Sequence, residues 1–291
     1  LEDLEKEIAE LDEILKSKAR IKTIIVKELK SIAEKYGQPR KSIIIYNDVA
    51  RYEEETVEIP DYPVNLFFTK EGYFKKITPQ SLRMSGEQKL KDGDEIIQEL
   101  EFTNNCDLLF FTDKCQVYKA KADDFAQTKA SVLGDYVAAK LGFDEDENAV
   151  KMVVTKDYKG MLLFAFENGK AAKVPLESYA TKTNRKKLTG AYSDKSPLVG
   201  LLYMPEDEEV LFKASSGNML LVHTGALALK TTRSTQGVAV LKPKKGHRLF
   251  SIERYKDGTF TNPKRYRTGS LPARGALPVN DDSKDEQLSL I

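Results

Sequence analysis

PVNLFFTKEGYFKKITP, residues 63–79, is followed further along the chain by a near copy, CDLLFFTDKCQVYKAKA, residues 106–122. Two looser copies come after them, LLFAFENGKAAK at 162–173 and VLFKASSGNMLL at 210–221. Each copy consists of an apolar run rich in Leu, Val and Phe, a short turn and a second run. This order predicts a β-hairpin, and its repetition predicts a chain built from related β units.

Three of the four hairpin turns hold a glycine, which can supply positive φ. Gly72, Gly169 and Gly217 stand in three of the turns, and Cys115 takes the equivalent place in the second copy. Glycine adopts positive φ at no steric cost because it has no Cβ. The turn chemistry therefore agrees with the apolar runs that flank it.

The spacing of the hairpins indicates the architecture. The copies recur about every 50 residues, a period typical of four-stranded propeller-like blades. A lone hairpin cannot bury its apolar face, so the copies must stack side by side. The sequence thus predicts a mainly β, propeller-like fold of four to five blades, with six as the upper bound. Ser42–Tyr46 is expected to supply the strand that closes the ring with the last blade. The other expected strands are Val64–Thr69, Asp107–Thr112, Met161–Phe166 and Val210–Lys213.

Three segments of different composition suggest the domain organisation. Residues 1–37 carry apolar residues at helical spacing, with a break expected near Ser17 and a stop at Gly37. We interpret them as the end of a coiled-coil arm, residues 38–254 as the β body and residues 255–291 as a flexible tail. The tail is rich in Gly, Pro, Arg and Ser and then turns acidic, a composition typical of disorder.

Composition excludes several function classes. Hydrophobic residues make up 41% and charged residues 31% of the 291 residues, as in a soluble folded protein. No apolar run approaches the roughly 20 residues that span a bilayer, and the first residues are unlike a signal peptide. Two cysteines and two histidines provide neither a disulfide framework nor a set of metal ligands. We expect a cytoplasmic protein without a metal site.

Positive charge is unevenly distributed although the net charge is only +1. Residues 210–252 contain no Asp or Glu, and residues 170–193 contain Glu177 alone. If equivalent parts of successive blades share a rim, these clusters form a curved positive surface suited to a polyanion backbone. The plainer interpretation is that they are solvated faces. Gly190 and Gly237 follow basic, Thr-containing loops and would let main-chain N–H groups approach phosphates, or would simply form turns.

The candidate DNA-binding residues follow from these clusters. The first choices are Arg185, Lys186 and Lys187 in the third unit and Arg233, Lys242, Lys244 and Lys245 in the fourth. The second choices, on hairpin strands, are Lys75, Lys76, Lys119 and Lys173.

The chain resembles the C-terminal part of the A subunit of bacterial type IIA topoisomerases, DNA gyrase and topoisomerase IV. LEDLEKEIAELDEILKS and the following IKTIIVKELKSIAEKYGQPRKS are similar to the end of that family's coiled-coil arm. FFTKEGYFKK and LLFFTDKCQVYKAK are similar to its blade signature. The resemblance covers the chain through residue 254 and implies a β-pinwheel, a disc whose blades exchange strands and whose basic rim bends DNA.

One departure from the family pattern concerns the gyrase box. The A subunits of gyrase carry a motif close to Q-R-R-G-G-K-G after the first hairpin, where this chain has SLRMSGEQKLKDGD, residues 81–94. Arg83 and Gly86 are the remaining similar positions, while Glu87, Asp92 and Asp94 repel phosphate. Topoisomerase IV-type decatenation and relaxation is therefore favoured over gyrase-type wrapping.

The resemblance also implies which catalytic parts this fragment lacks and which partners it binds. The catalytic tyrosine lies upstream in the family, and the ATP and Mg sites lie in other domains, so the fragment alone is not an enzyme. The implied partners are double-stranded DNA, the B subunit of the topoisomerase, and a second A subunit, in the bacterial nucleoid. The final QLSLI, Gln287–Ile291, resembles a sliding-clamp-binding peptide. The rival from another class is a protein-docking propeller with incidental basic patches.

Overall fold

The computed structural model describes residues 2–38, 42, 59–84, 87–181, 186–279 and 282 of the chain. The chain divides into two compact units, residues 1–57 and 58–291. The strand predicted at Ser42–Tyr46 lies outside the described residues except for Ser42 itself.

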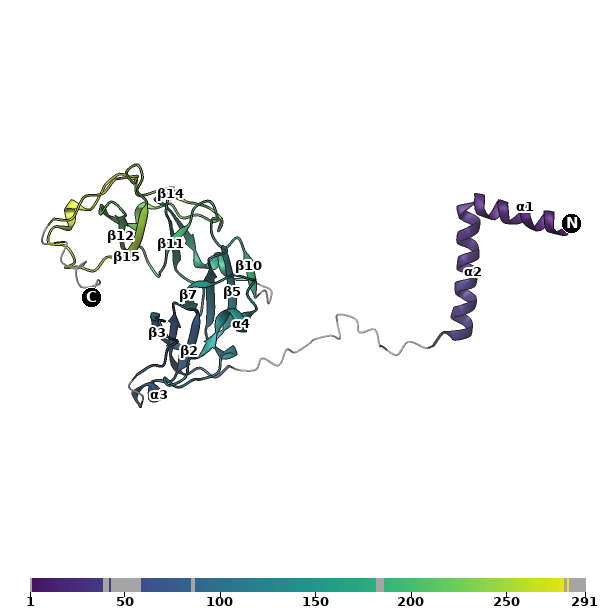
Figure 1. Cartoon of the computed structure of the whole chain (residues 1–291), viewed down its shortest axis with the longest axis horizontal. Helices are drawn as coiled ribbons and strands as arrows, with labels where there is room; N and C mark the ends of the chain where they lie inside the picture. The colour runs from purple at the N-terminus through teal and green to yellow at the C-terminus, as the bar shows by residue number, and fades with distance from the viewer. Residues whose placement is uncertain are drawn as a thin grey trace. The chain divides into compact units, whose positions relative to one another are not determined.

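The first unit is helical, as predicted. It contains α1 (Glu2–Lys16) and α2 (Lys18–Tyr36), which change direction at Ser17 (Figure 1). The Ser17 side chain accepts a hydrogen bond from the Arg20 N–H and caps α2, and Gly37 follows its last turn. The apolar stripe is exposed on both helices. No helix of the described residues is long and apolar enough to cross a membrane.

The second unit contains short strands in small sheets, with brief helical turns between them. The α-helices are α3 (Pro79–Arg83) and α4 (Val137–Leu141), and the 3-10 turns are η1 (Ala122–Asp124), η2 (Leu176–Tyr179), η3 (Thr224–Ala226) and η4 (Pro263–Arg265). The strands are β1 (Pro63–Thr69), β2 (Tyr73–Ile77), β3 (Ile96–Thr103), β4 (Asp107–Thr112), β5 (Gln116–Lys121), β6 (Asp135–Tyr136), β7 (Ala149–Thr155), β8 (Met161–Phe166), β9 (Lys170–Pro175), β10 (Lys187–Thr189), β11 (Leu198–Met204), β12 (Glu209–Ala214), β13 (Met219–His223), β14 (Val238–Ala239) and β15 (Leu249–Arg254).

The four hairpins predicted from the repeat are confirmed. They are β1–β2, β4–β5, β8–β9 and β12–β13, each antiparallel. Gly72, Gly169 and Gly217 have φ of 84°, 78° and 79°, and Cys115, at φ 56°, holds the same position without a glycine. Each hairpin gains a third strand on its first strand, and the result is a set of four blades (Figure 1).

The first three blades receive their outermost strands from the unit that follows each of them. The connection after β5 supplies β6 to β2, the connection after β9 supplies β10 to β5, and the connection after β13 supplies β14 to β9. The sheet orders are β3-β1-β2-β6, β7-β4-β5-β10, β11-β8-β9-β14 and β15-β12-β13. The strand exchange implied by the family resemblance is therefore present, and it ties neighbouring blades together through main-chain hydrogen bonds.

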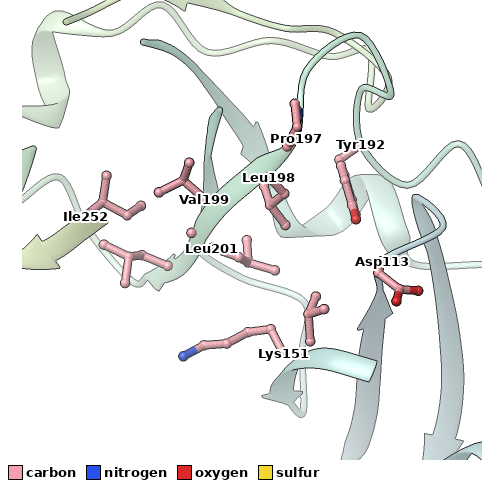
Figure 2. Close-up of a pocket in the computed structure, with 11 residues that line it drawn as sticks. Asp113, Lys151, Tyr192, Pro197, Leu198, Val199, Leu201 and Ile252 are labelled. Carbon is pink, nitrogen blue, oxygen red and sulfur yellow. The ribbon is translucent and has the colours of Figure 1, made fainter. Parts of the chain in front are cut away.

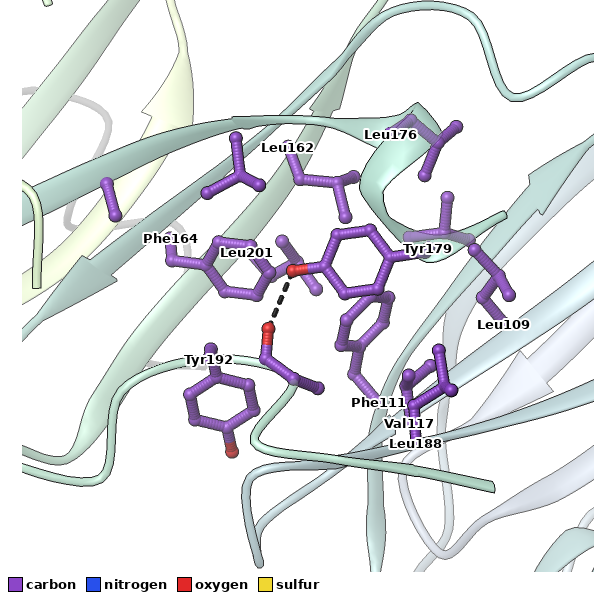
Figure 3. Packing of buried hydrophobic residues seen from close by; sticks show 14 of the residues in the cluster. Leu109, Phe111, Val117, Leu162, Phe164, Leu176, Tyr179, Leu188, Tyr192 and Leu201 are labelled. Atoms are coloured by element: carbon purple, nitrogen blue, oxygen red, sulfur yellow. Dashed lines mark hydrogen bonds between the residues drawn. The ribbon is translucent and has the colours of Figure 1, made fainter. Parts of the chain in front are cut away.

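The core lies between successive blades. Phe110 of β4 packs toward the first blade, whereas its neighbour Phe111 packs toward the third, where it meets Phe164 and Tyr179 (Figure 3). Both phenylalanines are fully buried. Because the first strand of a middle blade is covered on both faces, its sequence is a continuous apolar run rather than an alternating one. The LLFF run of the second copy is the sequence signature of this position.

Part of the C-terminal segment predicted to be flexible packs against the fourth blade. Leu221 and Met219 of β13 form bridges with Arg267 and Ala276, so this segment occupies the place of the donated outer strand. Tyr266 is 1% exposed, and its hydroxyl donates a hydrogen bond to Asp282. The prediction was wrong for this part because it weighed composition alone, whereas the edge of β13 provides main-chain partners for a polar segment.

Candidate nucleic-acid interface

A polar groove of about 660 Å³ lies between two neighbouring donated connections of the second unit. One wall comes from the β9–β11 connection and the other from the β13–β15 connection. Its lining residues are Ser178, Ala180, Thr181, Leu188, Thr189, Gly190, Thr231, Thr232, Arg233 and Ser234. None of them is acidic, and most carry a hydroxyl, so we call this site the hydroxyl groove.

Strand exchange explains why these residues meet. Leu188 pairs with Val117 of the second blade, and Leu229, just before Thr231, bridges Lys173 of the third blade. Each connection is thus pinned to the blade before its own, and the two run next to each other. The sequence predicted two separate basic loops, and the structure brings residues 188–190 of the first and residues 232–234 of the second to one groove.

Arg233 is the one charged residue among the described residues that line the hydroxyl groove. Its guanidinium lies 5.7 Å from the centre of the Tyr179 ring, a cation–π contact, and donates a hydrogen bond of 3.4 Å to the Ser178 carbonyl. Tyr179 is itself fixed, since its hydroxyl donates a 2.6 Å hydrogen bond to the Ala191 carbonyl (Figure 3). The arginine is therefore held in place by a rigid ring, and the remaining N–H groups of its guanidinium can donate to a ligand.

Lys186 and Lys187 lie beside the groove, and they differ in whether their ammonium groups already have a partner. Lys186 is exposed. The ammonium of Lys187 donates a 2.6 Å hydrogen bond to Asp144, and this carboxylate raises the pKa of Lys187 above its ordinary value. Lys186 is thus available to an anion, whereas Lys187 must leave Asp144 to reach one.

Lys119, one of the second choices made from the sequence, contacts a wall of the groove. Its ammonium donates a 3.0 Å hydrogen bond to the Thr181 hydroxyl and lies 4.9 Å from the centre of the Tyr158 ring. Burial lowers the pKa of Lys119. Its contribution is to orient Thr181 rather than to extend into solvent.

Lys242, Lys244 and Lys245 follow β14 and are all exposed. The Lys242 N–H donates to the Ala273 carbonyl, and Gly246, at φ 82°, turns the chain after Lys245. None of these lysines lines the hydroxyl groove. They form a separate exposed basic segment, residues 242–245.

The structure contradicts the prediction that Lys75, Lys76 and Lys173 reach a DNA backbone. Their exposed fractions are 1%, 2% and 5%. Lys76 donates to Asn104 (2.6 Å) and the Ala122 carbonyl (2.7 Å) of the next unit. Burial lowers the pKa values of Lys75 and Lys76. These lysines are internal because the donated connection crosses the hairpin above them.

Lys173 holds the third blade to the fourth in the way that Lys76 holds the first to the second. Its ammonium donates 2.9 Å hydrogen bonds to Asp207 and to the Thr224 carbonyl. The Lys173 ammonium lowers the pKa of Asp207. A buried, fully bonded ammonium of this kind fixes the contact between blades, and removing either partner leaves an uncompensated polar group.

Gly190 and Gly237 have different roles. At Gly190, φ is 61° and a Cβ would meet no atom of the described residues within 4 Å, and the residue lines the hydroxyl groove. At Gly237, φ is 71° and a Cβ would lie 1.9 Å from the Ala171 carbonyl oxygen. The expectation that the main chain at Gly237 lets a phosphate come close is wrong, because the space that a side chain of Gly237 would take is filled by Ala171 of the neighbouring strand.

The loop in place of the gyrase box keeps one of its acidic groups occupied. Asp94 accepts hydrogen bonds from the N–H groups of Glu71 and Glu95, at 2.9 and 2.8 Å, and Arg83 lies at the end of α3. Several positions singled out in the sequence lie outside the described residues: Arg185, Gly86 and the terminal segment Gln287–Ile291.

Sequence reasoning missed three of the six hydroxyl residues that line the groove, Ser178, Thr181 and Thr231. Ser178 is in η2, which has no distinctive pattern, and Thr181 precedes the loop that drew attention. The run TTRST at residues 231–235 was the available signal, since four of its five members carry hydroxyls. Over the described part of the chain, no group of three His, Cys, Asp or Glu side chains is arranged to hold a metal ion.

No family model matches the chain. Among curated proteins, it is 28% identical over 276 residues to the DNA gyrase A protein of Streptomyces coelicolor, covering 89% of this chain and 32% of that protein. It is 25% identical over 303 residues to the DNA gyrase A protein of Metamycoplasma arthritidis, covering 97% of this chain and 34% of the relative. The chain thus spans about a third of the length of these relatives.

Two solved structures share the fold. The C-terminal domain of DNA topoisomerase IV matches with a TM-score of 0.59 at 24% identity, over 68% of this chain and 63% of that one. The E. coli ParC C-terminal domain matches with a TM-score of 0.51 at 14% identity, over 65% and 78%. The chain is thus similar over most of its length to bacterial DNA gyrase A proteins, and it has the β-pinwheel fold of the topoisomerase IV C-terminal domains.

Proposed function

We propose that the chain is the duplex-binding and duplex-bending module of a type IIA topoisomerase, that it contacts DNA without reading its sequence, and that it steers the transported segment toward the gate. The observation that carries this proposal is the hydroxyl groove, which joins Arg233 and a row of Ser and Thr side chains without an acid. Homology to the gyrase A proteins named above supports the assignment to this enzyme class.

The groove has the donors that a phosphate backbone requires. Hydroxyls, main-chain N–H groups and arginine forks supply most protein contacts to DNA phosphates, and none of these contacts reports the base sequence. Gly190 lets the main chain come close, since its Cβ position is empty. Lys186 and the basic segment 242–245 add positive charge outside the groove. These features favour binding that is general for duplexes and sensitive to salt.

Bending follows if one duplex contacts both the groove and the basic segment. Smooth bending of a 20 to 30 bp duplex by 40 to 90° costs on the order of 1 to 6 kcal/mol. A few lysine and arginine contacts to phosphate can offset this amount. Because the contacts would involve the backbone, the deformability of the duplex rather than its base edges would set any preference.

The finer assignment within the enzyme class rests on the first blade. The loop at residues 81–94 departs from the gyrase box, and its Asp94 is engaged with main-chain N–H groups. This favours topoisomerase IV-type decatenation and relaxation. Gyrase-type wrapping is the second candidate, and it is favoured by the curated relatives named above, which are gyrase A proteins.

The remaining parts of the reaction would come from elsewhere in the enzyme. We infer that strand cleavage, ATP hydrolysis and Mg binding belong to other domains or to the B subunit of the topoisomerase, and that the chain works beside a second A subunit. Docking of Gln287–Ile291 on a sliding clamp is a further proposal from the sequence alone.

Arg233→Ala tests the proposal at the groove. We expect it to weaken binding of every duplex sequence about three- to tenfold, because one charge-assisted phosphate contact is lost. Fluorescence anisotropy with two unrelated duplexes would measure the change. Lys156→Ala is the matched control, since Lys156 is paired with Asp61 and does not line the groove, so its loss should leave affinity unchanged. Equal affinities of the Arg233 variant and the parent would remove the groove from the DNA path and favour the protein-docking alternative.

A further inference from the structure

A second hollow, of about 470 Å³, lies over the third strands of the blades (Figure 2). Its apolar walls come from Val150 of β7, from Leu198, Leu201 and Leu202 of β11, and from Ile252 of β15. We call it the third-strand hollow. Its volume lies within the range of pockets that take small molecules, about 300 to 1,000 Å³.

Lys151 supplies a cation to this apolar surface. Its side chain lines the hollow and also an adjoining one of about 400 Å³, which shares Leu201 and Leu202. Among the described residues its ammonium has no hydrogen bond and no ion pair, unlike the ammonium groups of Lys75, Lys76 and Lys173. Burial, and after it the nearby Arg254, lowers the pKa of Lys151. A partly buried cation without a partner is unfavourable until an anion reaches it.

Two of the other charged groups near the hollow, Asp113 and Arg254, have hydrogen-bond partners of their own. Asp113 accepts hydrogen bonds from the Asn148 N–H (3.0 Å) and the Asn148 side-chain amide (3.1 Å). Figure 2 shows its carboxylate on the opposite side of the view from the Lys151 ammonium. Arg254 donates to Glu208 at 3.0 Å and to the Tyr203 carbonyl. Glu99 and Glu101 line only the adjoining hollow. Lys151 is therefore the charged residue of the third-strand hollow that has no hydrogen-bond or ion-pair partner among the described residues.

We propose that the third-strand hollow is a binding site for small organic anions with an apolar body, whose charged group pairs with Lys151. The leucine and isoleucine side chains of the hollow disfavour a phosphate backbone, which would lose part of its hydration against them. Charge complementarity and the size of the hollow together favour a small amphipathic anion over a macromolecule. The site lies apart from the hydroxyl groove and does not depend on the proposed DNA binding.

The test compares two fluorescent probes with the same aromatic body, anilinonaphthalene sulfonate and the uncharged N-phenylnaphthylamine, on the full chain. We expect saturable binding of both. Lys151→Met should lower the affinity for the sulfonate about tenfold and leave the affinity for the uncharged probe within about twofold, because only the charge-assisted contact is removed. Lys151→Arg should retain sulfonate binding.

A cavity-filling variant serves as the positional control. Val150 is 39% exposed and lies on a strand, so Val150→Phe should fold, occupy the hollow and weaken both probes. The proposal is overturned if the parent shows no saturable sulfonate binding, or if Val150→Phe leaves both affinities unchanged. It is equally overturned if a Lys151→Met variant with the parent's circular dichroism spectrum binds the sulfonate as the parent does.

Discussion

Gly237→Ala should lower the free energy of unfolding by about 3 kcal/mol or more. Two effects add at this position. The φ of 71° is unfavourable for any residue with a Cβ, and the new methyl would lie 1.9 Å from the Ala171 carbonyl oxygen and 2.5 Å from the Ala172 Cα. Main-chain atoms of a paired strand cannot move aside without breaking the exchange between β14 and β9. Urea unfolding followed by circular dichroism would measure the change.

Gly190→Ala is the matched control for this prediction. Its φ of 61° imposes a similar conformational penalty, but a Cβ would meet no atom within 4 Å in the described part of the chain. We expect a loss of about 1 to 2 kcal/mol. If the two variants lost the same stability, the close crossing of the donated strand over Ala171 would be contradicted.

Replacing Lys242, Lys244 and Lys245 together with alanine should have the largest effect on DNA affinity. The three side chains are exposed, and no ion pair of theirs is found within the described residues. If each contacts a phosphate, their loss should reduce the slope of log K against log salt by up to about 3, and lower affinity at low salt on the order of a hundredfold. Anisotropy titrations over a salt series would measure both quantities.

A charge-matched variant separates local contacts from the loss of net charge. Lys22, Lys27 and Lys30 are exposed on α2, where alanine is a good helix former, so their triple replacement removes the same charge from the first unit. We expect this control to keep nearly the parent's salt slope. Equal losses in the two triple variants would mean that net charge alone, rather than the basic segment 242–245, governs the affinity.

The hairpins could be predicted from the sequence because their signal is local. An apolar run, a turn residue with positive φ and a second run lie within a dozen or so residues of each other, and Gly72 and Gly169 mark the turns directly. Cys115 shows that the flanking runs suffice even where the glycine is missing. The break of the N-terminal helix at Ser17 was predictable for the same reason.

The strand exchange could not be read from composition or periodicity. β6 and β14 have two residues each and β10 has three, too few to show a period. The connections that carry these short strands determine whether the hairpin lysines are buried or exposed. Lys76 and Lys173 look like surface charges in an amphipathic strand, yet each lies where a donated connection crosses, and each is buried by it.

The hydroxyl groove was only partly accessible to sequence reasoning. Arg233 and Gly190 were selected because basic and Thr-containing loops are suited to phosphate, and both line the groove. Ser178 and Thr181 were not selected, since their position beside Thr231 depends on two connections being pinned to successive blades. The basic residues that were chosen for charge alone divided into exposed ones, such as Lys244, and paired ones, such as Lys187.

The measurement that tests the central claim most directly is the affinity of the full chain for linear duplexes of increasing length across a salt series. A backbone-binding, bending surface predicts affinity that increases with length until the groove and the basic segment are both occupied, and that falls steeply as salt rises. Weak binding that changes neither with duplex length nor with salt would contradict the account.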